Sequence, residues 1–177
     1  MTDNRPLGKR CSAGNTQIEF ALCAVFIVFL LISIVDLARG MWIYHTLAEA
    51  VRDGTRHAIV RGDRYVDPVT GNRLAGATLA DARAVVLRHA AGLDPNQLNL
   101  RFESPAGTIT CNPATNCPGG SLGQTWPPVG FASAGLEVGI IARYPYNSLV
   151  VMYFPGGGGL NFGNYTLGSS SRERIVF

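Results

Sequence analysis

The sequence has few charged residues, and this scarcity excludes several classes of protein. Only 15% of its 177 residues are Asp, Glu, Lys or Arg, and the net charge is +3. The basic residues are scattered rather than clustered, which gives nucleic-acid binding little support. Hydrophobic residues make up 47% of the chain, so its composition is not that of a disordered chain.

The sequence also lacks an assembled catalytic, phosphate-binding or metal-binding motif. The glycines at 156–159 are not followed by Lys and then Ser or Thr, which a phosphate-binding loop requires. No serine nucleophile elbow is present, and His45 and Glu49, one helical turn apart, have no evident third ligand. We therefore predict that the protein is not an enzyme and has no cofactor or metal site.

Near the start, by contrast, lies a long apolar run. Between Phe20 and Val35 the only polar side chain is that of Ser33. Together with Ile18 the run spans about 27 Å as a helix, close to the hydrocarbon thickness of a bilayer. Because the run is longer than a signal-peptide core and no A-x-A-like cleavage site follows it, we expect residues 15–36 to form a retained transmembrane helix.

The helical pattern continues beyond this anchor. Residues 37–61 are expected to extend the helix to about Val60, where "RGDRYVDPVTGNRLAG" ends it. An apolar seam follows alternating spacings of four and three: Leu37, Met41, Tyr44, Ala48, Val51, Thr55 and Ala58. Such a seam suits either dimerisation or packing under a head domain, and we favour packing.

Residues 62–177 are expected to form an α+β head with a mostly antiparallel sheet. A second helix is predicted in "ATLADARAVVLRHAAGL", with Thr78 as N-cap and Gly92 as its stop. Alternation predicts strands in "NQLNLRFES", "GLEVGIIARYPY" and the tail "LNFGNYTLGSSSRERIVF". The stretch after "NQLNLRFES", with its cysteines, is predicted as a loop, and "NSLVVMYFPGGGG" fits a strand or a short helix.

Two cysteines, Cys111 and Cys117, bracket the turn-forming loop "CNPATNC". A disulfide between them would suit an oxidising compartment. Two unpaired thiols are the alternative, and zinc has less support because a second ligand pair is missing.

A single carboxylate, Glu19, interrupts the start of the apolar run, five residues after Gly14. With the basic residues upstream, this arrangement resembles the processing site of type IV prepilins and their relatives. In that family a membrane peptidase cuts after the glycine, so the resemblance implies a cut between Gly14 and Asn15. It also implies that Glu19 pairs with the terminal amine of a neighbouring subunit. Glu19 lying in the headgroup zone with no such role is the alternative.

More narrowly, the chain resembles the TadE-like minor pilins of tight-adherence pilus systems. The resemblance rests on "GNTQIEFAL", "TLAEAVRDGTRHAIVRG", "AAGLD", "LEVGIIARYPY" and "TLGSSSRER", in that order from Gly14 to Arg174. It implies a minor pilin or pseudopilin that acts in pilus assembly. The expected partners are a prepilin peptidase, an inner-membrane assembly platform, other pilin-like subunits and the lipid bilayer.

The predicted topology places residues 1–14 in the cytoplasm as a leader and the head in the periplasm. Arg5, Lys9 and Arg10 precede the helix, while Arg39 and Arg52 follow it, which slightly favours a cytoplasmic N-terminus. Incorporation into a fibre would place the head outside the cell. The alternative function is an uncleaved, single-pass anchored domain for binding or sensing.

Overall fold

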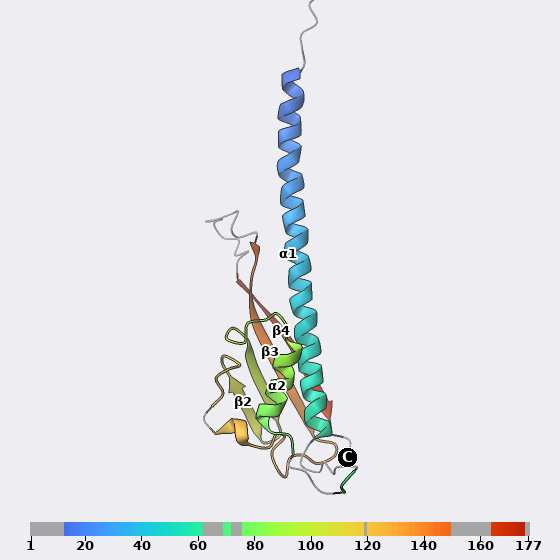
Figure 1. The fold of residues 1–177 in the computed structure, drawn as a ribbon, viewed down its shortest axis with the longest axis vertical. Coiled ribbons are helices and arrows are strands. Elements are labelled where there is room, and N and C mark those ends of the chain that lie inside the picture. The colour runs from blue at the N-terminus through green and yellow to red at the C-terminus, as the bar shows by residue number, and fades with distance from the viewer. Residues whose placement is uncertain (1–12, 62–68, 72–75, 119, 150–163, 176–177) are drawn as a thin grey trace, which may run out of the picture.

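The structure, a computed structural model, describes residues 13–61, 69–71, 76–118, 120–149 and 164–175. Its elements are two α-helices, a short 3-10 helix and a four-stranded sheet (Figure 1). The predicted α+β class is therefore confirmed.

Helix α1 runs from Ala13 to Val60 without interruption, 48 residues in all. At 1.5 Å per residue it is about 72 Å long, more than twice the hydrocarbon thickness of a bilayer. Its first half stands clear of the rest of the molecule, and its second half packs into the head (Figure 1). The single long helix predicted from about residue 16 to Val60 is confirmed.

Helix α2, Leu79–His89, begins with the predicted cap. The Asp81 amide donates to the Thr78 hydroxyl oxygen at 3.2 Å, and the Thr78 amide donates to Asp81 Oδ2 at 3.0 Å, which completes a capping box. The Thr78 hydroxyl also donates to Asp81 Oδ2, at 2.7 Å, and the bonds from the Thr78 amide and hydroxyl lower the pKa of the Asp81 carboxyl. Gly92 has φ +80° just past the helix, a conformation that favours glycine and supports its predicted role as a stop.

Replacing Thr78 with alanine should lower the free energy of unfolding of the head by about 1 kcal/mol, because α2 loses its N-cap acceptor. Thr78→Ser keeps a hydroxyl in the same place and should stay close to wild type. Chemical denaturation of the purified protein in detergent would measure both variants. Equal stability of the two variants would show that the capping box contributes nothing.

The sheet is antiparallel throughout, with strand order β2-β1-β3-β4. Its strands are β1 (Asn99–Ser104), β2 (Gly107–Cys111), β3 (Glu137–Asn147) and β4 (Asn164–Arg174). The three predicted strands are thus found, as β1, β3 and β4. The prediction of a loop after β1 was wrong at β2, because Ser104 pairs with Gly107 and closes a tight hairpin there. The predicted element in "NSLVVMYFPGGGG" lies largely outside the described residues.

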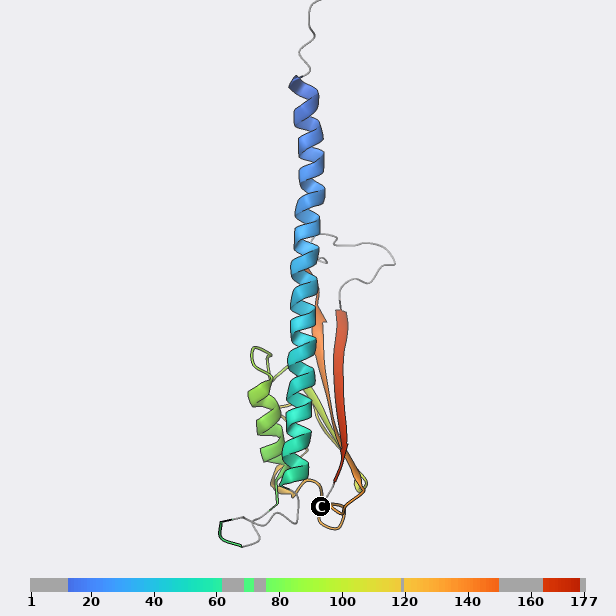
Figure 2. The same ribbon diagram turned by 90° about the vertical axis from the view of Figure 1, so that its right-hand side faces the viewer.

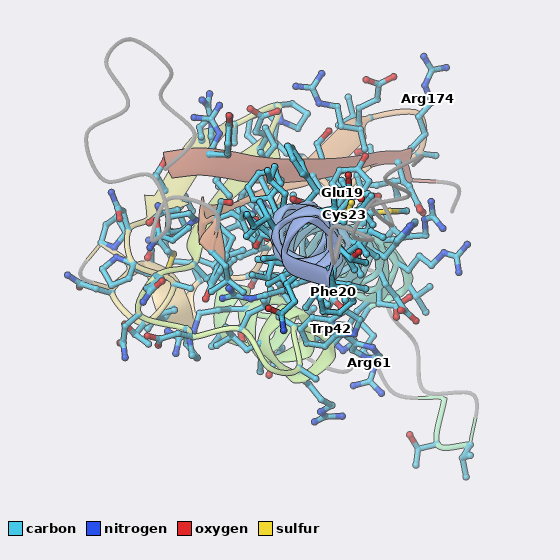
Figure 3. All side chains as sticks on the ribbon, turned by 90° about the horizontal axis from the view of Figure 1, so that it is seen from above. Glu19, Phe20, Cys23, Trp42, Arg61 and Arg174 are labelled. Atoms are coloured by element: carbon cyan, nitrogen blue, oxygen red, sulfur yellow. A yellow bond between two sulfur atoms is a disulfide. The ribbon has the colours of Figure 1, made fainter. Side chains whose placement is uncertain are left out.

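The second half of α1 lies between α2 and the sheet, as the side view and the view from above both show (Figures 2 and 3). Buried residues from all three layers form one core, in which the Trp126 ring meets the Phe102 ring edge-on at 5.3 Å between centroids. Gly54 marks the closest approach of the layers. A Cβ there would stand 2.4 Å from Val86 Cγ2 on α2 and 3.1 Å from Ile140 Cδ1 on β3.

The apolar seam predicted along α1 is correct only in its lower part. The exposed fraction falls from 68% at Leu37 through 47% at Tyr44 to 1% at Val51 and zero at Thr55. The sheet covers this helix face only near the end of α1. Closer to the apolar half of α1, a different face of the helix packs against the head, and it carries Ile43, Leu47 and Ala50. The upper seam is therefore not part of the core.

Candidate functional site

The apolar half of α1 is exposed on all sides. Apart from Ile32, which is partly buried, its large hydrophobic side chains from Ile18 to Val35 keep between 41% and 75% of their surface accessible. The most apolar window of the helix has a mean hydropathy of 2.9, and none of it is buried. Exposure of so much apolar surface would be unfavourable in water. This half of α1 is long and apolar enough to cross a membrane.

Glu19 lies on one particular face of this helix. Figure 3, which looks down α1, shows Glu19 and Cys23 on the side toward β4, and Phe20 and Trp42 on the opposite side. Glu19 is exposed. Leu37 follows it by about five turns of 3.6 residues, so the two share a face.

The predicted scissile bond lies inside the first turn of α1, because the helix begins at Ala13. Amide groups in a first turn lack partners within the helix, and helix ends fray. Gly14 adds the low helix propensity of glycine at this point. The N-terminal end of α1 therefore combines a weak helical turn with Gly14 and Glu19, the glycine and the carboxylate of the predicted site.

A second polar group, Asp36, closes the apolar segment and is only 7% exposed. Its carboxylate accepts hydrogen bonds from three groups at the end of β3. The Tyr146 hydroxyl donates to Oδ1 at 2.6 Å, the Leu149 amide donates to Oδ1 at 3.1 Å, and the Ser148 hydroxyl donates to Oδ2. We call this set of contacts the Asp36 clamp. It fixes the upper end of the sheet to α1 at the boundary of the apolar segment.

The Tyr146 ring packs closely around this clamp. Its hydroxyl also lies 2.7 Å from the Asp36 carbonyl oxygen, and a Cβ on Gly40 would stand 3.6 Å from its ring. The Arg39 guanidinium lies 5.5 Å from the ring centroid, in range of a cation–π interaction. Burial and then the bond to Asp36 raise the pKa of Tyr146 to about 12. The phenol is therefore protonated and a donor throughout the physiological pH range.

The family model of TadE-like proteins matches residues 14–56, from the predicted cleavage glycine to the part of α1 packed in the head. This segment is TadE-like. The suspected resemblance to TadE-like proteins is thus confirmed for this segment. The other motifs used for the resemblance, from "AAGLD" onward, lie beyond the matched segment. No curated protein and no solved structure matched the chain.

The TadE-like segment contains three of the predicted site residues, Gly14, Asn15 and Glu19, all within the first seven residues of α1. It also contains Asp36, for which the sequence alone predicted no role. The missed signal was a lone carboxylate directly after sixteen uncharged positions, the same kind of signal that drew attention to Glu19. Its partners lie more than a hundred residues away.

Cys111 and Cys117 lie far from the TadE-like segment, at the end of β2 and in the loop after it. A disulfide joins them in the structure, with their Cα atoms 4.1 Å apart. Cys111 is fully buried in the core. The bond therefore ties the loop to the edge of the sheet rather than to α1.

The candidate metal pair on the TadE-like segment gains no third ligand. His45 and Glu49 are both exposed on α1. Among the described residues, no three His, Cys, Asp or Glu side chains gather to hold a metal ion. His89 instead lies near Asp53, with 3.2 Å between Nδ1 and Oδ2.

Proposed function

We propose that the protein is a minor pilin or pseudopilin that acts in the assembly of a tight-adherence pilus. The observation that carries this proposal is the family match, which begins at Gly14 and includes Glu19 and the whole exposed apolar half of α1. In this proposal a prepilin peptidase cuts between Gly14 and Asn15. The mature chain stays in the inner membrane until other pilin-like subunits and an assembly platform engage its helix.

The proposed domain limits follow from the same features. Residues 1–14 form a cytoplasmic leader, 15–36 cross the membrane, 37–61 continue the helix in the periplasm, and 62–177 form the head. The disulfide between Cys111 and Cys117 supports an oxidising location for the head.

Glu19 is proposed to act between subunits. After cleavage, the new amine of Asn15 carries a positive charge about one helical turn from this carboxylate. Each charge is costly in a low-dielectric environment when it is alone and tolerable when it is paired. A pair between Glu19 of one subunit and the Asn15 amine of the next would set the axial register of neighbouring helices.

Coexpression with a prepilin peptidase should yield a mature chain that starts at Asn15, as determined by mass spectrometry of a C-terminally tagged protein. Gly14→Phe should block the cut, because a large side chain would obstruct the peptidase next to the scissile bond. Gly8→Phe places the same side chain within the leader and should still be processed.

An intact N-terminus in the presence of a peptidase that cuts a known substrate would refute processing. The leading function would then be the uncleaved, single-pass anchored binding or sensor domain. If processing occurs, Glu19→Ala should leave the cut intact and reduce pilus formation, whereas Gln17→Ala, on another face of α1, should do neither.

A further inference from the structure

An apolar groove opens between α1 and the upper ends of β3 and β4, next to the Asp36 clamp. Its volume is about 550 Å³. The helix contributes one wall and the two strands the other, chiefly through Leu37, Met41, Tyr44, Tyr146, Tyr165 and Leu167. The helix wall is the upper part of the seam that the head leaves uncovered.

The side chains of this groove are strongly exposed for an apolar surface. Leu37 exposes 68% of its surface, Met41 55% and Tyr165 51%. Leu37 and Met41 continue the face of α1 that carries Glu19, and the polar part of the lining comes from Ser33, Asp36, His45 and Ser148. In water, such a hollow would leave apolar surface hydrated at a free-energy cost.

The position of the groove along α1 shows which layers of the bilayer it would meet. It begins at Ser33, inside the apolar segment, and extends past Asp36 to His45. Met41 follows Asp36 by about 7.5 Å along the helix. The headgroup layer on each side of the hydrocarbon is about 5–7 Å thick. When Asp36 marks the hydrocarbon boundary, the groove therefore starts in the hydrocarbon, crosses the headgroup layer and reaches its outer edge near Met41, with His45 about 6 Å further out.

The aromatic residues fit the same location. Tyrosine and tryptophan favour the membrane–water interface, where an apolar ring and a polar tip are both satisfied. Tyr44, Tyr146 and Tyr165 line the groove. Trp42 lies at a similar depth on the other side of α1, with 52% of its surface exposed. Among the described residues, no Lys or Arg side chain lines the groove, and Asp36 supplies its one carboxylate.

We propose that this groove binds an acyl chain of a phospholipid from the leaflet that faces the head. The chain would leave the bilayer along Leu37 and Met41 and contact Tyr165 on the opposite wall. The groove is continuous with the lipid-facing surface of α1, which favours lipid over a second copy of the protein. The proposal requires the membrane-spanning helix but not the pilin role, so it stands or falls independently of processing at Gly14.

Site-specific photocrosslinking in phosphatidylcholine vesicles would test the proposal on the full-length chain. Tyr165→p-benzoylphenylalanine places the reactive group in the groove on β4, away from the helix. Thr166→p-benzoylphenylalanine is the matched control, because adjacent strand residues point to opposite faces of the sheet at nearly the same depth. Met41→p-benzoylphenylalanine probes the helix wall. All three replaced residues are exposed, so the fold should tolerate the change.

Irradiation should add the mass of a phospholipid at positions 165 and 41, with adduct at position 166 no higher than in unirradiated samples. Equal lipid adduct at 165 and 166 would overturn the proposal, since it would indicate general contact with the bilayer. A crosslinked dimer at 165, or a crosslink within the chain to residues 150–163, would identify another occupant and overturn it too. Lipid adduct at position 41 without adduct at position 165 would also overturn the proposal.

Discussion

Replacing Asp36 with alanine should lower the free energy of unfolding of the head by about 3 kcal/mol, because one buried and two partly buried donors would lose their acceptor. The Tyr146 hydroxyl, the Ser148 hydroxyl and the Leu149 amide all donate to this one carboxylate. Removing it leaves the Tyr146 hydroxyl with only the Asp36 carbonyl oxygen as a partner in the clamp.

Two further variants separate the clamp from a general effect of charge removal. Tyr146→Phe removes one donor and leaves the carboxylate with two, so the expected loss is smaller, about 1.5 kcal/mol. Asp53→Ala removes a partly exposed carboxylate of the same helix that lies near His89, and such pairs contribute about 0–1 kcal/mol.

Hydrogen exchange gives the most local measurement of the clamp. The Leu149 amide should exchange much faster in Asp36→Ala than in wild type, because its hydrogen bond to Oδ1 is gone. Amides in the centre of β3, such as that of Ile140, should be far less affected. If Leu149 exchanges at the same rate in both proteins, the clamp does not hold the end of β3 to the helix.

Gly54→Ala is expected to destabilise the head, although alanine is the better helix former by about 1 kcal/mol. The new Cβ would stand 2.4 Å from Val86 Cγ2 and 3.1 Å from Ile140 Cδ1. Overpacking of a close-packed core costs about 1–3 kcal/mol. We expect the upper end of that range, because α2 and β3 are both pressed against this point, and hence a net loss of about 2 kcal/mol after the propensity gain.

Gly40→Ala is the matched control on the same helix. Its Cβ would meet the Tyr146 ring at 3.6 Å, an ordinary contact, so it should be neutral or stabilising. Val86→Ala should rescue Gly54→Ala by removing the clashing methyl groups, which a double-mutant cycle measured by chemical denaturation would show as favourable coupling. A stabilising Gly54→Ala would mean that α2 moves away freely and that glycine is not required there.

The elements of this fold were predictable wherever the sequence pattern was local. The uninterrupted apolar run and the periodicity after it define α1, and Thr78 with Asp81 defines the start of α2. β2 was missed although its two threonines favour a strand, because it is only five residues long and lies between Pro105 and the turn-forming loop of the cysteines. Only its pairing with β1, from Leu100 with Cys111 to Ser104 with Gly107, makes it a strand.

The burial of the seam on α1 could not be predicted from its sequence. A spacing of three and four identifies an apolar face but not what covers it. Along one face, Val51 and Thr55 are buried in the head, while Leu37 and Met41 stay more than half exposed. The Asp36 clamp was unpredictable for the same reason, because its donors come from the far end of β3. Gly14 and Glu19 could be proposed as a site because the spacing that singles them out is local.

The Asp36 clamp has a mechanical consequence for the whole molecule. A flexible linker would let a head turn freely on its anchor, but here the sheet is bound to the helix within one turn of the apolar segment. The helix and the head are therefore rigidly connected. Rotation of the helix about its axis must turn the head by the same angle, and axial tension on the head must reach the apolar segment directly. A force applied to the head is thus passed on to the helix.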